Sequence, residues 1–137
     1  MRSRTRTALF LAGYWGPVLA QMGLIFYFSA QPKGSLILED FHLPGGVGHF
    51  IGYGLLGLLL YRAFNRGLAG WSGKAAGKSL LVAFLYALSD ELHQFFVPGR
   101  QAALTDVAID TAGILLALLI VRLLQHANFR KGGYKLF

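Results

Sequence analysis

The chain contains no cysteine and few charged residues. The absence of cysteine excludes disulfide bonds and thiolate metal sites. Charged residues make up 14% of the 137 residues, well below the roughly 25% of an average soluble protein. Only six residues are acidic, against 13 lysines and arginines. A chain so poor in charge is better suited to a membrane than to full solvation.

Hydrophobic residues, 55% of the chain, gather into four long runs. A helix needs roughly 20 apolar residues to cross a bilayer core, and the continuous runs argue against the alternating pattern of a β-barrel. We therefore predict an all-α integral membrane protein with one domain over residues 1–137. Its four transmembrane helices are expected in two hairpins, at about residues 8–28, 47–64, 79–97 and 104–124. Pro17, after Gly16, is expected to kink the first helix.

The basic residues are distributed unevenly along the chain. Lysine and arginine favour the cytoplasmic side of membrane proteins. Eleven of the 13 lie at the start of the chain, between the second and third runs, or around the end of the fourth, and only Lys33 and Arg100 lie elsewhere. This pattern predicts an N-in/C-in topology. It does not resemble the solvated basic surface of a nucleic-acid-binding protein. With this topology, all six acidic residues are expected at the outer end: Glu39, Asp40, Asp90, Glu91, Asp106 and Asp110.

Residues 90–113 concentrate polar groups between apolar runs. Ionisable groups in such places are costly and mark functional sites. The third and fourth helices meet here, and the second helix begins at the same depth. We hypothesise one buried or half-buried network in which Arg100 is the counter-ion of the carboxylates. Its members would be His49, Glu91, Gln94, Arg100, Asp106 and Asp110.

Blander roles compete with this network. Interfacial carboxylates cap helices or meet headgroups, and an arginine in a turn reaches lipid phosphates. Asp90 is expected to be a solvated or lumen-facing neighbour, and His42 and His93 to be ordinary interfacial residues. Gly48 and Gly52 form a Gly-x-x-x-Gly pair that favours close helix contact, including self-association.

Three chemical roles fit the network. Glu91 could act as a general acid or base on a lipid-linked substrate, histidines and carboxylates could bind a divalent cation, or a groove could recognise a headgroup or glycan. The sequence contains no His-Glu-x-x-His, Gly-x-Ser-x-Gly or phosphate-binding loop, so no established catalytic or metal motif is present. We therefore expect no metal or cofactor and favour a non-enzymatic role, with Glu91 as the catalytic candidate otherwise.

Five motifs follow one another over about residues 26–120: Phe28 to Pro32, His49-Phe50 with Tyr53, Glu91 with Gln94, Pro98-Gly99-Arg100, and Asp106 with Asp110 and Gly113. This ordered set resembles the VanZ-like family. The family usually has Asn where Asp110 stands. The resemblance implies a link to low-level resistance against teicoplanin, a glycopeptide that binds cell-wall precursors, or a more general envelope role.

We therefore expect a multi-pass protein of the bacterial inner membrane. Its outward-facing polar site would bind or act on a lipid-linked or headgroup component of the cell envelope, with an effect on teicoplanin susceptibility. The alternatives are a small membrane enzyme that uses Glu91 and a structural subunit of a membrane complex. Expected partners are membrane lipids, a lipid-linked cell-wall precursor or a glycopeptide, and a second copy of the chain in a homo-oligomer.

Overall fold

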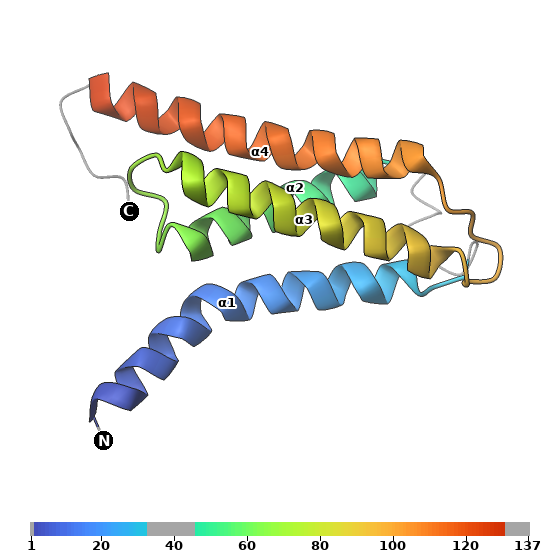
Figure 1. Cartoon of the computed structure of the whole chain (residues 1–137), viewed down its shortest axis with the longest axis horizontal. Coiled ribbons are helices and arrows are strands. Elements are labelled where there is room, and N and C mark those ends of the chain that lie inside the picture. Colours follow the sequence, from blue (N-terminus) through green and yellow to red (C-terminus); the bar gives the residue numbers. More distant parts are fainter. Residues whose placement is uncertain (1, 33–45, 131–137) are drawn as a thin grey trace.

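The computed structural model describes residues 2–32 and 46–130, with side chains placed for residues 7–32 and 46–128. These residues form four helices and no strand, which confirms the predicted all-α class. Figure 1 shows α2, α3 and α4 packed along one axis, with α1 beside them at one end and diverging at the other. The helices are α1 (Arg2–Ser29), α2 (Val47–Phe64), α3 (Gly73–Gln94) and α4 (Leu104–Arg130).

Helix α3 lies earlier in the chain than the predicted 79–97 span. It begins at Gly73 because Ser72 caps it, accepting a hydrogen bond from the Ala75 backbone N–H at 3.2 Å, as serine commonly does before a helix. It ends at Gln94. The bounds of α2 match the predicted span, and α1 and α4 extend beyond theirs.

Three helices are long and apolar enough to cross a membrane: residues Thr7–Ser29 of α1, all of α2, and Leu104–Asn128 of α4. Helix α3 is not among them, and it carries charged residues near both ends. It packs against α2 and α4 and more lightly against α1. Its passage through the membrane as a fourth span stays a prediction.

Glycines bring α2 and α4 into close contact. A Cβ atom added to Gly113 of α4 would overlap the carbonyl oxygen of Phe50, and one added to Gly57 would lie 2.9 Å from Ile114 Cγ2. Gly54 also faces the Gly113 carbonyl oxygen. Such small residues let helix backbones approach closely within a membrane.

The predicted Gly48–Gly52 pair does not make this contact. Gly48 has no neighbouring atom within 4 Å of an added Cβ, whereas Gly52 faces Ile25 of α1. The Gly52 carbonyl oxygen also accepts a hydrogen bond from Gln21 Nε2 at 3.0 Å. Gly52 is thus covered within the chain, and Gly48 is open with respect to the described residues.

Helix α1 bends, as predicted from Pro17, and Figure 1 shows the bend. Proline has no backbone N–H, so the carbonyl oxygen of Gly13, four residues earlier, loses its helical donor. Arg62 Nη1 donates to that oxygen at 3.0 Å. The bend therefore supplies an acceptor that ties α1 to α2.

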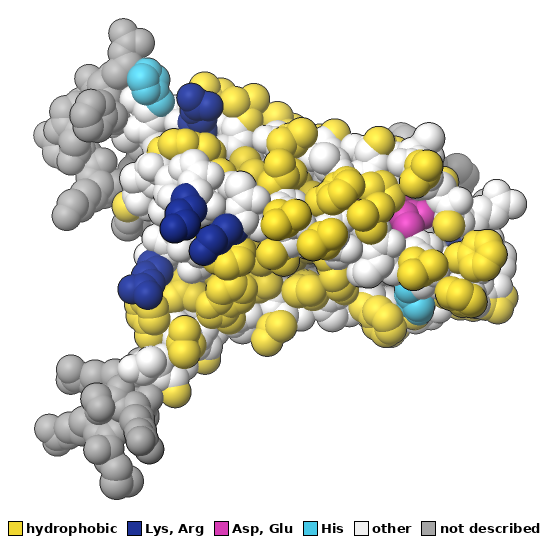
Figure 2. Space-filling model, in the orientation of Figure 1, with side chains coloured by type: hydrophobic (Ala, Val, Ile, Leu, Met, Phe, Trp, Pro, Cys, Tyr) yellow, Lys and Arg dark blue, Asp and Glu magenta, His cyan; other side chains and the backbone are white. Residues whose placement is uncertain are grey.

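The two ends of the bundle differ in charge. The start of α1, the α2–α3 turn and the end of α4 lie at one end (Figure 1), where the visible Lys and Arg side chains gather (Figure 2). An acidic side chain is visible toward the opposite end (Figure 2). This asymmetry is the one that the N-in/C-in prediction requires, and the orientation itself stays a prediction. The predicted outer residues Lys33, Glu39, Asp40 and His42 lie outside the described residues.

Candidate functional site

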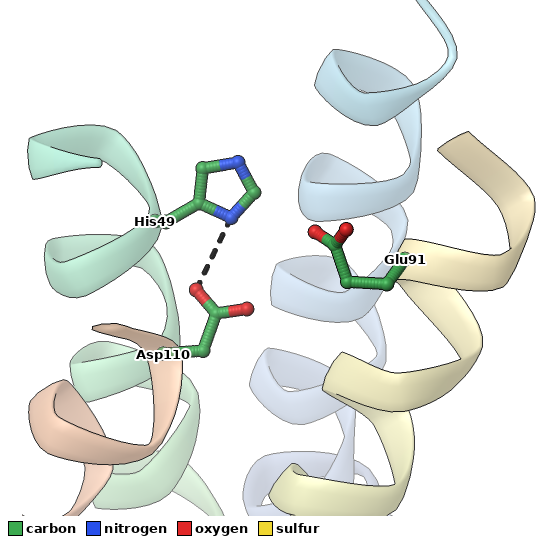
Figure 3. Close-up of side chains that lie close together, drawn as sticks. All are labelled: His49, Glu91 and Asp110. Carbon is green, nitrogen blue, oxygen red and sulfur yellow. Dashed lines mark hydrogen bonds and ion pairs between the residues drawn. The ribbon is translucent and has the colours of Figure 1, made fainter. Parts of the chain in front are cut away.

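Three ionisable side chains meet where α3 ends and α4 begins. His49 comes from the first turn of α2, Glu91 from the last turn of α3, and Asp110 from the second turn of α4. Figure 3 shows both carboxyl groups and the imidazole directed into the space between these helices. One ring nitrogen of His49 and one oxygen of each carboxyl group lie within 4.8 Å of one another. We call these three residues the polar cluster.

His49 and Asp110 form the tightest contact of the cluster. His49 Nδ1 lies 3.1 Å from Asp110 Oδ1. The Asp110 side chain is fully buried, and the His49 side chain is 22% exposed. No other ion pair occurs among residues 7–32 and 46–128. Because an unpaired buried carboxylate is costly, His49 is an important partner for Asp110.

Glu91 ties the end of α3 to the start of α4. Its Oε2 atom accepts a hydrogen bond from the Ala103 backbone N–H at 2.8 Å, and Ala103 immediately precedes α4. The other oxygen, Oε1, is buried and has no hydrogen-bond partner, and the same is true of Asp110 Oδ2. Buried polar atoms are usually paired, so these two oxygens are available to a partner that the described residues do not provide.

Asp90 is buried, which corrects the expectation that it is solvated. It is 4% exposed, and its Oδ2 atom accepts three hydrogen bonds, from Ser29 Oγ at 2.8 Å, Tyr53 OH at 3.2 Å and Gln94 Nε2 at 3.3 Å. We call these four residues the Asp90 group. They join α1, α2 and α3 beside the polar cluster.

Gln94 belongs to this second group. It is 2% exposed, and its Nε2 atom also lies 3.3 Å from Ser29 Oγ. Tyr53 connects the two groups, because its hydroxyl binds Asp90 while its ring lies nearly parallel to the His49 ring, 6.5 Å away. In place of one predicted network, the structure therefore contains two adjoining groups, the polar cluster and the Asp90 group.

Arg100 does not act as the predicted counter-ion of the carboxylates. Its Nε atom donates to the Gln31 carbonyl oxygen at 3.1 Å, and Nη2 donates to the Phe28 carbonyl oxygen at 3.3 Å. Carbonyl groups at a helix end lack helical donors, which explains why the guanidinium group binds there. Arg100 thus fastens the α3–α4 turn to the end of α1.

Asp106 and His93 lie around the cluster. Asp106 is half-buried in the first turn of α4 and interacts electrostatically with all three cluster residues. His93 packs its ring against Phe26 of α1, 4.6 Å between centroids and nearly parallel. It is not a member of the polar cluster, and its Nδ1 atom is buried without a hydrogen-bond partner among the described residues.

The sequence reasoning missed Ser29 and underrated Asp90. Ser29 lies in the Phe28 to Pro32 motif, so its position in that motif could have drawn attention to it. Tyr53, a further member of the Asp90 group, lies one helical turn after His49, and that spacing could have indicated that it lies near the site. The arrangement can accept hydrogen bonds, exchange a proton through Glu91 or His49, or bind a cation through one nitrogen and two oxygens.

A family model described as VanZ/LLP1 matches residues 14–125. This region includes every residue of the polar cluster and of the Asp90 group. No curated protein and no solved structure matches the chain. Together with its three membrane-capable helices, the match over most of the sequence shows that the chain is a VanZ-like membrane protein of the VanZ/LLP1 family.

Proposed function

We propose that the protein lies in the bacterial inner membrane and uses the polar cluster to bind a component of the cell envelope at the outer surface. The observation that carries this proposal is the pair of unpaired buried oxygens, Glu91 Oε1 and Asp110 Oδ2. A buried acceptor without a partner costs about 1–3 kcal/mol, and more when it is charged. A ligand that fills these positions recovers that free energy.

The outward orientation is supported by the charge asymmetry of the bundle. Arg62, Arg66, Lys74 and Lys78 lie at or near the end where α2 and α3 are joined. The bias of basic residues toward the cytoplasm assigns that end to the inside. The polar cluster, at the other end, then faces the outer leaflet and the surface outside it.

Helix α3 completes the proposal as a fourth span. Three of its polar residues near the outer end, Asp90, Glu91 and Gln94, are buried among the other helices, and Ser79 Oγ donates to the Ala75 carbonyl oxygen within the helix. Polar groups satisfied inside a bundle are compatible with a membrane-spanning helix.

The ligand is expected to carry hydrogen-bond donors that reach the carboxyl groups of the polar cluster at the membrane surface. Carboxylate oxygens accept hydrogen bonds from hydroxyl and amino groups, which lipid headgroups and the sugars of lipid-linked cell-wall precursors carry. The family resemblance adds an effect on teicoplanin susceptibility, since that glycopeptide acts on such precursors outside the membrane. Binding or shielding of a precursor would change its access to the drug.

A second candidate is a small enzyme in which Glu91 is the general acid or base. It is favoured by the geometry of the side chain, because Ala103 holds Oε2 while Oε1 stays unpaired beside His49. A positioned carboxyl group of this kind can transfer a proton to a bound substrate. Turnover, rather than binding alone, would distinguish this candidate.

A third candidate is a structural subunit or homo-oligomer. The open Gly48, with the exposed Ile51 and Leu55 on the same helix, offers a face for a second helix. A Gly48→Leu variant should then lose the oligomeric mass of the wild type in detergent. An unchanged mass would remove this candidate.

A deletion strain tests the proposed function directly. Membrane lipids, cell-wall precursors and teicoplanin susceptibility would be compared between the parent, the deletion and the complemented strain. We expect a changed amount of at least one lipid-linked species, restored by the wild-type gene. Accumulation of a species that purified protein converts would favour the enzyme, and identical profiles with identical susceptibility would contradict an envelope role.

A further inference from the structure

The polar cluster has the composition of a metal site. It brings together one imidazole and two carboxyl groups from three different helices. Imidazole nitrogen suits zinc, iron, copper and nickel, and carboxylate oxygen suits harder divalent cations. A mixed set of one nitrogen and two oxygens therefore fits a divalent transition metal such as Zn²⁺ or Mn²⁺.

The spacing of the ligand atoms is close to what such an ion needs. Bonds of about 2.0–2.2 Å in a tetrahedral site hold ligand atoms about 3.4 Å apart. His49 Nδ1 and Asp110 Oδ1 are 3.1 Å apart, and the whole set lies within 4.8 Å. Small changes in the side-chain torsion angles would bring the three ligand atoms to this separation.

The unpaired oxygens are a second and independent observation. Glu91 is 5% exposed and Asp110 is fully buried, yet Oε1 and Oδ2 have no partner. Figure 3 shows both carboxyl groups directed into the common space. Glu91 can offer Oε1 without losing the hydrogen bond that Oε2 accepts from Ala103, so the backbone would hold this ligand in place, as outer hydrogen bonds do at metal sites.

The charges of the region also call for a cation. Three carboxyl groups, those of Asp90, Glu91 and Asp110, are buried together. Asp90 is satisfied by three donors, but among the described residues the one side chain beside Glu91 and Asp110 that can carry a positive charge is His49. Arg100, the nearest arginine in sequence, is engaged with carbonyl oxygens of α1. A bound divalent ion would offset the remaining negative charge.

We propose that His49, Glu91 and Asp110 bind one divalent transition-metal ion, with one ring nitrogen and one oxygen from each carboxyl group as ligands. Three protein ligands leave a further position open, as at catalytic zinc sites. Where the proposed function also holds, the ion would replace direct hydrogen bonds from the envelope component to these carboxyl groups, and its open position would take an oxygen of that component, a hydroxyl or a phosphate. Metal binding itself does not depend on that function.

The test is metal binding by the full-length protein, purified without a histidine tag, stripped with a chelator and held in detergent. Zn²⁺ and Mn²⁺ would be titrated separately, with stoichiometry measured by elemental analysis and stability by thermal unfolding. We expect saturable binding of one ion per chain and a higher unfolding temperature, because a ligand that binds only the folded state stabilises it. If neither ion binds saturably, the proposal is overturned.

Variants locate the site. His49→Ala removes one of three ligands and should weaken binding at least about 100-fold, more than the loss of an outer hydrogen bond does. Glu91→Gln and Asp110→Asn keep the side-chain shapes, so they decide the matter if His49→Ala does not fold. His93→Gln is the matched control, since His93 lies at the same end but packs on Phe26. Equal losses in His93→Gln and His49→Ala would contradict the assignment.

The assay is separate from the proposed function because it contains no lipid-linked precursor. Failure to bind metal, with a changed envelope profile in the deletion strain, would remove the metal site and leave the envelope role. Metal binding with an unchanged envelope profile would keep the site and remove the envelope role.

Discussion

His49 at the start of α2 and Asp110 in the second turn of α4 lie 61 positions apart in the chain and form a contact of 3.1 Å at a fully buried carboxyl group. Phe50, the residue after His49, and Gly113, three residues after Asp110, form a close backbone contact between the same two helices. The polar cluster therefore depends on how tightly α2 and α4 pack.

Removal of the histidine should destabilise the fold. His49→Ala leaves the Asp110 carboxyl group buried without its ionisable partner, and we expect a loss of about 3 kcal/mol, the lower end for a broken buried pair, because His49 is partly exposed. Adding Asp110→Asn should recover part of the loss. Unfolding of detergent-solubilised protein, followed by tryptophan fluorescence, measures both. Equal stability of His49→Ala and wild type would show that the pair contributes nothing.

The glycine contact between α2 and α4 should not tolerate a methyl group. Gly113→Ala forces the helices apart at the Phe50 carbonyl, and we expect a loss of about 1–3 kcal/mol. Gly77→Ala is the matched control, because nothing lies within 4 Å of an added Cβ on this helical glycine; it should gain about 0.5–1 kcal/mol from helix preference. Similar unfolding of both variants would contradict the packing described here.

The Asp90 group should behave as a structural unit. Asp90→Ala leaves the side-chain donors of Ser29, Tyr53 and Gln94 without their shared acceptor, and we expect a loss of about 3 kcal/mol. Asp90→Asn keeps one acceptor oxygen and should lose less. The unfolding midpoints of the two variants rank these effects. A greater loss in Asp90→Asn than in Asp90→Ala would argue against this network.

Arg100 should matter for the end of α1 rather than for the carboxylates. Arg100→Ala removes two hydrogen bonds to carbonyl oxygens at residues 28 and 31. We expect faster amide hydrogen exchange over residues 27–31, measured by mass spectrometry, because exchange reports local opening. Gln101→Ala, an exposed neighbour, is the control. Unchanged exchange in Arg100→Ala would place the role of this residue elsewhere.

The absence of cysteine makes the topology easy to test. Single cysteines at Ala69, in the α2–α3 turn, and at Gln101, in the α3–α4 turn, are both exposed positions. With an N-in/C-in arrangement, a membrane-impermeant maleimide should label Gln101→Cys in intact spheroplasts and Ala69→Cys only after lysis. The reverse labelling pattern would show that the polar cluster faces the cytoplasm and would contradict the predicted topology.

Composition and periodicity predicted the helices well. The bounds of α2 were predicted correctly, and the bend at Pro17 followed from the missing N–H. The start of α3 was placed too late because its first residues, with Lys74 and Lys78, resemble a basic loop. Only the structure shows that Ser72 caps a helix there.

The site was harder to predict, for a geometric reason. Asp90 and Glu91 are adjacent and point about 100° apart on a helix, so one of them was expected to face solvent. Helix α3 packs against α1, α2 and α4, which buries both. Sequence spacing could not show that His49, Glu91 and Asp110 lie close enough to share a metal ion either, because the three residues come from three helices. The role of Arg100 depended on the position of α1, which spacing does not fix.

The most direct test of the account is complementation of a deletion strain by Glu91→Gln, which keeps the shape of the side chain and removes its charge. Lys74→Gln, an exposed charge removal near the opposite end, is the control. We predict that wild type and Lys74→Gln restore the envelope profile and teicoplanin susceptibility, whereas Glu91→Gln, at equal membrane abundance, does not. Full restoration by Glu91→Gln would contradict a functional role for the polar cluster.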